Sequence, residues 1–198
     1  MGVIRGWAMS FVKTVPVGEA QGLLREQYER FAKSLGLAEP PNLTKAWSLQ
    51  PEIAKAWLDF GHLAMDRSGL SNKEIELMLT RITHRLKCAY VTRNHAWILW
   101  RITGWTKRRV IDVVRKRDWS GLSNREKRLV RLADKICARS HRTNRRDIEG
   151  LRRSGLTEAQ ITAALFLIGW LVSDAVIPNT LGPAPDGFSQ DFSSAVDW

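Results

Sequence analysis

Three residues that could act together in acid–base or thiol chemistry lie within twenty positions of one another: Glu76, Cys88 and His95. A histidine and a carboxylate can accept and return protons near neutral pH, and a thiolate can attack an electrophile. Cys88 and His95 are seven residues apart, about two helical turns, so we expect both side chains on one helix face. The spacing predicts a centre built from a thiol, an imidazole and a carboxylate.

The position of Cys88 bears on its reactivity. If Cys88 lies in the first turn of a helix, the unpaired backbone amides there favour the thiolate and lower the thiol pKa. The neighbouring Lys87 and Arg93 would add to this effect. The spacing alone also fits a structural interpretation, in which Cys88 is a small core residue, His95 is hydrogen-bonded and Glu76 is a solvated helix charge.

Helical signals dominate the segments that must position these residues. Ser71, Ser123 and Thr157 each precede a Glu or Gln by three residues, which is the pattern of a helix-starting capping box. We expect Pro178 to end the last helix. The result is an all-α, single-domain bundle of about eight helices. The expected helices cover 18–35, 51–65, 71–86, 88–102, 106–114, 123–139, 144–155 and 157–176.

The flanking segments and the composition set further expectations. We divide the chain into an N-terminal extension (1–14), a helical domain (15–182) and a C-terminal tail (183–198) that is loop or a strap bound to a partner. The residues are 44% hydrophobic, and nine Trp predict a Trp-lined core or interface. The longest apolar stretch, 163–172, is too short for a membrane span. Two cysteines and no secretion signal favour a reducing compartment, the cytoplasm.

The positive charge is concentrated in one part of the chain. Residues 101–153 hold 18 Lys and Arg against 6 Asp and Glu, which accounts for the whole net charge of +11. Such a segment could bind nucleic acid or another anion, or it could be a solvated surface. We see no helix-turn-helix pattern, so nucleic acid is possible but not favoured, and a non-catalytic binding protein remains an alternative.

The motif residues resemble the alkylhydroperoxidase D-like branch of the carboxymuconolactone decarboxylase family. The peroxidase motif of that family is a Glu, a Cys-x-x-Cys twelve residues later and a His four residues after the second Cys. Glu76, Cys88 and His95 match the Glu, the first Cys and the His. The likeness covers roughly residues 15–182. Shorter segments that resemble the family's helix starts are 41–52, 70–76, 122–126 and 156–161.

One departure from this motif decides which chemistry is expected. Val91 stands where the family has its second cysteine, so the sulfenic acid formed at the first thiol could not be resolved as a disulfide there. The resemblance then implies an alkylhydroperoxidase-like oxidoreductase with a single thiolate, Cys88, and a Glu76/His95 proton relay. The alternative that it leaves open is a cofactor-free decarboxylase, lyase or isomerase that uses His95 and Glu76 as base and acid on a small organic acid.

Other residues are candidates for the substrate site. His84, Tyr90, Val91, Arg81 and Asn179 are expected to line it. In the second reaction class, Arg81, or otherwise Arg85 or Arg93, would hold a substrate carboxylate. The substrate is then a small molecule, a hydroperoxide or an organic acid. No metal site or cofactor motif is evident. The resemblance also implies a homo-oligomer, a dimer, trimer or hexamer.

Overall fold

The computed structural model describes residues 9–198 and confirms the all-α class, since these residues form helices and no strand. Nine α-helices and three 3-10 segments are present in this range, against about eight helices expected. The bounds are η1 Val17–Glu19, α1 Gly22–Leu35, α2 Asn42–Ala46, α3 Pro51–Ser68, α4 Asn72–Arg85, α5 Ala89–Thr103, α6 Lys107–Val114, α7 Asn124–Arg139, η2 Ser140–Arg142, α8 Arg145–Arg152, α9 Glu158–Leu181 and η3 Gly187–Val196.

Local capping explains where most helices begin. The three capping boxes predicted from the sequence are present, at the starts of α4, α7 and α9. In each, the side chain of the cap residue accepts from the backbone three residues on, and the Glu or Gln returns a bond to the cap amide. Several helices end at a glycine with a left-handed backbone, as at Gly104 after α5, where φ is 66°.

The last α-helix is longer than predicted. Pro178 lies inside α9, which continues to Leu181, so the expectation that Pro178 ends the helix is wrong. A proline lacks the amide hydrogen that would bond the carbonyl of Asp174, but packing on both sides holds the helix together across the missing bond. Leu171, Ala175 and Pro178 are all buried along this stretch. In α9, tertiary packing therefore outweighs the tendency of Pro178 to end a helix.

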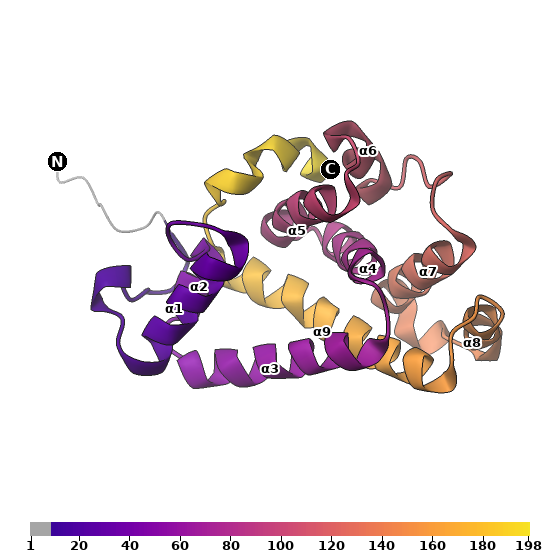
Figure 1. The fold of residues 1–198 in the computed structure, drawn as a ribbon, viewed down its shortest axis with the longest axis horizontal. Helices are drawn as coiled ribbons and strands as arrows, with labels where there is room; N and C mark the ends of the chain where they lie inside the picture. The colour runs from indigo at the N-terminus through magenta and orange to yellow at the C-terminus, as the bar shows by residue number, and fades with distance from the viewer. Residues whose placement is uncertain (1–8) are drawn as a thin grey trace.

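Helix α9 is the central element of the bundle. It runs beside α3, while α4 and α5 form an antiparallel hairpin that crosses it, and α7 and α8 lie at the far end (Figure 1). Within residues 9–198, α9 is the one helix whose length and apolar composition match those of a membrane span, but half of that apolar stretch is buried in the bundle. Burial of this kind is typical of a core helix.

The C-terminal tail is part of the helical domain. The sequence predicted loop or strap for 183–198, yet residues Gly187–Val196 form η3 and pack along α5 (Figure 1). Phe192 and Ala195 are fully buried against α5 and α6. At the other end of the chain, the Phe11 amide donates to the carbonyl of Leu181 at 2.8 Å. Residues 1–8 of the expected N-terminal extension lie outside the described residues.

Candidate active site

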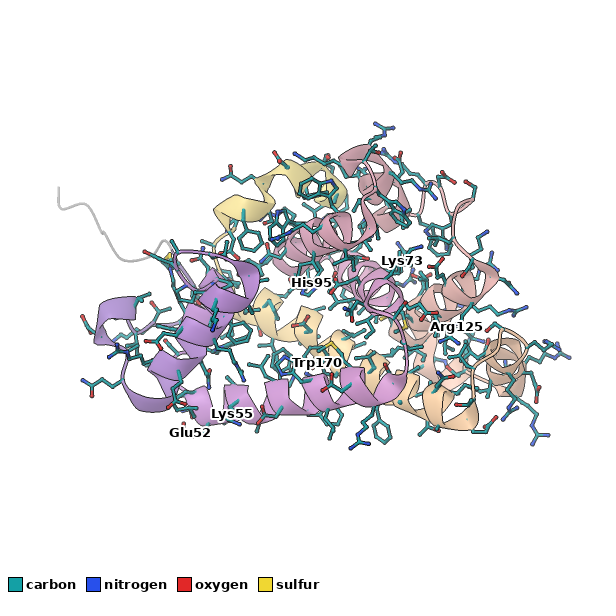
Figure 2. All side chains as sticks on the ribbon, in the orientation of Figure 1. Glu52, Lys55, Lys73, His95, Arg125 and Trp170 are labelled. Carbon is teal, nitrogen blue, oxygen red and sulfur yellow. The ribbon has the colours of Figure 1, made fainter. Side chains whose placement is uncertain are left out.

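The α4–α5 hairpin brings Glu76 and His95 together. The two helices are antiparallel and turn near residue 86, so positions at equal distances from the turn lie side by side. His95 Nδ1 lies 2.9 Å from Glu76 Oε2. The side chains of His95 and Glu76 keep 25% and 13% of their surface accessible, and both line one pocket. His95 lies between α5 and α9 in Figure 2.

The electrostatics of this pair suit proton transfer. Burial lowers the pKa of His95, but the charge and hydrogen bond of Glu76 raise it, and the net result is a pKa above the ordinary 6.5. Because Nδ1 faces the Glu76 carboxylate, Nε2 is the nitrogen without a partner among residues 9–198. A carboxylate at Nδ1 orients the ring and stabilises the imidazolium that forms when Nε2 takes a proton.

The pocket itself is small and lined mostly by apolar side chains, aliphatic as well as aromatic, with Phe188 of the C-terminal segment among them. Its volume is about 240 Å³, enough for a small organic molecule. The polar and titratable lining residues are Ser34, Thr44, His62, Glu76, Asn94, His95 and Asp174, with Tyr90. The aromatic rings of the lining are Phe31, Trp47, Trp57, Tyr90, Trp170 and Phe188.

Asp174 on α9 contributes a second carboxyl group to this pocket. The residue is 6% exposed, and no side-chain hydrogen bond or ion pair within residues 9–198 involves it. Burial raises its pKa from 3.8 to about 7, with His95 opposing and Glu76 adding to the shift. Asp174 can therefore change its protonation state near neutral pH, as an acid–base catalyst must.

Cys88 differs from its expected setting. It precedes α5 as the N-cap residue, with φ −84° and ψ 89°, instead of lying in the first helical turn. Its side chain is fully buried and is not among the pocket lining. Burial raises the thiol pKa to about 11, although the amides of Val91 and Tyr90 lower it. The predicted lowering of the Cys88 pKa is therefore wrong, because desolvation outweighs the helix terminus.

Val91, not Cys88, is the motif position that lines the pocket. It lies four residues before His95, one helical turn, so the two side chains share a face of α5. A cysteine at this position would sit beside the imidazole. The substitution that distinguishes this chain from the family motif thus removes a sulfur from the pocket itself and leaves the buried one.

Tyr90 and Asn94 line the pocket and hold the C-terminal segment. The Tyr90 hydroxyl accepts from the Leu43 amide at 2.9 Å and donates to the carboxylate of Asp186. Asn94 Nδ2 donates to the same carboxylate at 2.9 Å, and Ser189 Oγ donates to Asn94 Oδ1 at 2.6 Å. With its hydroxyl hydrogen engaged, Tyr90 shapes the pocket wall and is not a free proton donor.

The other expected substrate-site residues lie outside the pocket. Arg81 pairs with Asp134 of α7 at 2.8 Å, an ion pair that joins α4 to α7. His84 packs edge-on against Trp198, and burial together with Arg81 and Arg115 lowers its pKa to about 4. Asn179 Nδ2 donates to the carbonyl of Leu86 at the end of α4. These three expectations are corrected: Arg81 and Asn179 link helical segments, and His84 packs against the C-terminal Trp198.

Two kinds of site residue were missed from the sequence. Asp174 had a signal, since it is the lone charged residue between Glu158 and Asp186 in a strongly apolar stretch, and such a residue needs a reason to be buried. The aromatic lining from α1, α2 and α3 had none, because Trp47 and Trp57 reach the pocket only through the packing of distant helices. Among residues 9–198, no group of three or more His, Cys, Asp or Glu is placed to hold a metal ion.

The basic segment lies away from this pocket, on α6, α7 and α8. Part of its charge is used within the fold, as in the Arg109–Asp118 and Lys135–Asp147 ion pairs. Arg145 and Arg146 in the first turn of α8 are exposed. None of its Lys or Arg residues lines the pocket. The segment therefore does not supply the charge that would guide an anion into it.

Comparisons with known proteins place this geometry in context. The model of the carboxymuconolactone decarboxylase family matches residues 51–135, which span α3 to most of α7. A search of curated protein sequences gives no significant match. Among solved structures, an uncharacterized peroxidase-related protein from Ralstonia eutropha JMP134, described as an alkylhydroperoxidase AhpD core, superposes with a TM-score of 0.82 at 20% identity, covering 95% of this chain and 97% of that one.

Two further structures share the fold. An uncharacterized peroxidase-related protein from Silicibacter sp. TM1040 has a TM-score of 0.80 at 20% identity and covers 95% of this chain and 97% of its own. A debrominase, Bmp8, as a cysteine-to-alanine variant in complex with 2,3,4-tribromopyrrole, has a TM-score of 0.74 at 11% identity and covers 98% and 99% of the two chains. At these identities the likeness establishes the fold.

Proposed function

Because the family match and the shared fold confirm the resemblance to the carboxymuconolactone decarboxylase and alkylhydroperoxidase D-like family, we propose that this protein is a cofactor-free enzyme of the proton-transfer type. His95 acts as the base through Nε2, Glu76 orients and stabilises it, and Asp174 serves as the second acid–base group. The reaction class is a lyase or isomerase step on a small, mostly apolar molecule. The observation that carries the proposal is the convergence of these three groups on one pocket.

The lining composition bears on the substrate. No Lys or Arg is among the residues that line the pocket, and two carboxyl groups are. A substrate carboxylate would meet Asp174 and the Glu76–His95 pair, whose charges balance each other, with no Lys or Arg to offset it. The decarboxylase form of the hypothesis, with Arg81 holding an organic acid, is therefore less well supported than proton transfer on an uncharged molecule. The debrominase of the same fold binds a small planar ring, which agrees with a pocket of this size.

The main alternative is peroxidase chemistry at Cys88. The backbone amides of Val91 and Tyr90 lower the pKa of the Cys88 thiol, and two of the fold neighbours are called peroxidase-related. Against this alternative stand the burial of the thiol, its raised pKa and the absence of a cysteine at position 91. Peroxide treatment followed by a sulfenic-acid probe tests it directly.

Solvent exchange with simple carbon acids tests the proposed reaction class. A panel of small uncharged lactones and cyclic ketones is incubated with the protein in D₂O, and loss of the carbon-bound proton next to the carbonyl is followed by NMR. We expect catalysed exchange for some members, lost in His95→Ala and Glu76→Gln and kept in Cys88→Ala and in the surface control Asp66→Asn. The proposal would be refuted if His95→Ala still catalysed the exchange. It would also be refuted if no member of the panel exchanged its proton while peroxide formed a sulfenic acid at Cys88.

We also propose that the outer face of α3 and α9 binds a second copy of this chain. Exposed apolar side chains gather there, and a groove of about 570 Å³ is lined mainly by apolar residues. Trp57 and Trp170 line both this groove and the pocket, so assembly would brace the pocket wall. Light scattering tests the proposal: Phe166→Lys, at a residue 61% exposed, is expected to lower the molar mass, and an unchanged mass would contradict it.

A further inference from the structure

The buried carboxyl group of Asp174 has no hydrogen-bond donor within residues 9–198. An ordinary buried carboxylate is satisfied by two or more donors, as Asp186 is by Asn42, Tyr90 and Asn94. Asp174 is 94% shielded from solvent and lines the pocket, yet it receives none. The Asp174 oxygens are not among the fully enclosed unpaired atoms, so they face the pocket space, and a molecule that displaces water from them must supply a donor in its place.

The charges that face Asp174 exclude one class of ligand. From α4 and α5 the pocket receives Glu76 and His95, which balance each other as a pair. From α3 it receives His62 at its exposed side, and α9 adds Asp174. Since the lining has no Lys or Arg, an anionic ligand would add to an uncompensated negative charge. The donor for Asp174 must come from a group that is neutral or positively charged.

The shape of the lining indicates a flat ligand body. Trp47, Trp57 and Trp170 form a connected series of rings, with centroid separations of 5.8 Å and 5.1 Å. Trp57 is fixed by its own hydrogen bond to Ser173 Oγ at 2.8 Å, and Trp170 donates to the Trp57 carbonyl at 3.0 Å. Rings held in this way present rigid apolar surfaces, on which a planar molecule gains contact with little loss of side-chain entropy.

From these observations we infer that the pocket binds a small planar molecule that donates an N–H or O–H hydrogen bond to Asp174 and carries no negative charge. This inference rests on the proposed function in one respect, that the same pocket is the substrate site. It adds a specificity-determining role for Asp174 and the hydrogen-bond donor that the ligand must carry; the 2,3,4-tribromopyrrole bound by the debrominase of the same fold is a small planar molecule with such an N–H. Asp174 favours ligands that carry a hydrogen-bond donor, and the aromatic walls favour ligands that are flat.

A matched pair of probes tests the inference. Indole and benzofuran have nearly the same shape, but indole has an N–H donor where benzofuran has an oxygen. Calorimetric titration at pH 8 is expected to show indole binding about tenfold more tightly than benzofuran, the effect of one hydrogen bond to a charged group. The difference should vanish in Asp174→Leu and persist in Asp66→Leu, whose carboxylate is exposed on α3. Equal affinities in the unmodified protein would overturn the inference without any variant.

Two further probes test the charge selection. Benzylamine and benzoate share a ring and differ in the sign of their charge. We expect benzylamine to bind and benzoate to bind at least tenfold more weakly. If benzylamine binds more tightly than indole, the donor is preferred as a cation, which still supports the inference. Benzoate binding as tight as that of indole would contradict it, as would an unchanged preference for indole in Asp174→Leu.

These experiments can contradict the inference about binding and the proposed function independently of each other. Affinity for the probes requires Asp174 and the aromatic walls, whereas isotope exchange requires His95 and Glu76. Exchange without a donor preference would remove this inference and leave the proton-transfer function. A donor preference without exchange would remove the function and leave a binding pocket of the stated class. For Asp174→Leu, circular dichroism and a melting curve establish folding, and Asp174→Asn provides a second variant of similar shape.

Discussion

Cys88 and His95 lie at the two ends of the same short stretch of sequence, yet they occupy opposite environments. His95 opens on the pocket and is held by Glu76 at 2.9 Å, while Cys88 is sealed from solvent and has a pKa raised to about 11. The seven-residue spacing predicts a common face only if both residues belong to the helix. Cys88 is the N-cap residue, whose backbone is not helical, so its side chain does not follow the helical rotation.

The difference teaches that a motif read from spacing can divide at a helix boundary. One part of the resemblance, Glu76 with His95, corresponds to a built site. The other part, the surviving cysteine, is a core residue in this fold. A single residue, Val91, marks the division, because it occupies the pocket position that a second cysteine would take.

The largest expected effect comes from removing the His95 imidazole, which tests whether His95 and Cys88 differ in function as they do in environment. His95→Ala should lower the rate of catalysed proton exchange by about 100-fold or more, the range over which a positioned base contributes. Cys88→Ala should leave the rate within about twofold, because the thiol does not reach the pocket. Rates from NMR on the two variants in parallel decide the matter. A larger loss in Cys88→Ala would transfer the chemistry to the thiol.

Asp174→Asn should change the pH dependence of stability. The folded-state pKa of Asp174, about 7, lies above its ordinary value of 3.8, so the folded protein keeps this proton over a range where the unfolded chain has released it. The associated stability is present at acid pH and is lost as the pH rises from about 4 to 7. Asn is neutral throughout.

Asp174→Asn should therefore have a higher free energy of unfolding than the unmodified protein at alkaline pH. The difference between the two proteins should be larger at pH 8 than at pH 5 by on the order of 3 kcal/mol. Urea unfolding at the two pH values measures the gap. The raised pKa of His95 acts in the same direction, and the part of it that comes from the Asp174 charge is absent from the variant. A gap that does not vary with pH would show that Asp174 stays ionised throughout.

Val91→Cys sharpens the comparison by placing a second thiol at the pocket wall. We expect the new thiol to react with a small neutral thiosulfonate about tenfold faster than Cys88, since access limits the buried group. Mass spectrometry after timed quenching locates the modification. If both thiols react at the same rate, Cys88 is as accessible to the reagent as position 91 on the pocket wall, which contradicts the comparison.

The smallest expected effect concerns the two native thiols. Cys88 is fully buried and Cys137 is partly accessible, while burial raises the pKa of each to about 11. Since the thiolate fractions are equally low, exposure decides the order, and Cys137 should be alkylated a few times faster than Cys88. Peptide mapping after brief exposure to iodoacetamide tests this, and the reverse order would indicate that Cys88 is reached through the pocket.

Local sequence signals predicted much of the fold and only part of the site. Ser71, Ser123 and Thr157 predicted three helix starts because a cap needs only residues within one turn. The prediction that Pro178 ends the last helix is wrong, because burial of α9 in the bundle outweighs the lost amide hydrogen bond. Glu76 and His95 could be paired through their motif, but Asp174, a hundred residues beyond Glu76, joins them through tertiary packing that no spacing rule describes.

The docking of η3 on α5 has a consequence for how the protein acquires its pocket. Asp186 and Phe188 reach Tyr90 and Trp97 across some ninety residues of chain. Contacts so distant in sequence form after local ones, because the chain entropy of closing the intervening loop opposes them. The helical hairpin can thus be in place while one wall of the pocket is still open. During refolding, ligand recognition should appear after helicity is complete.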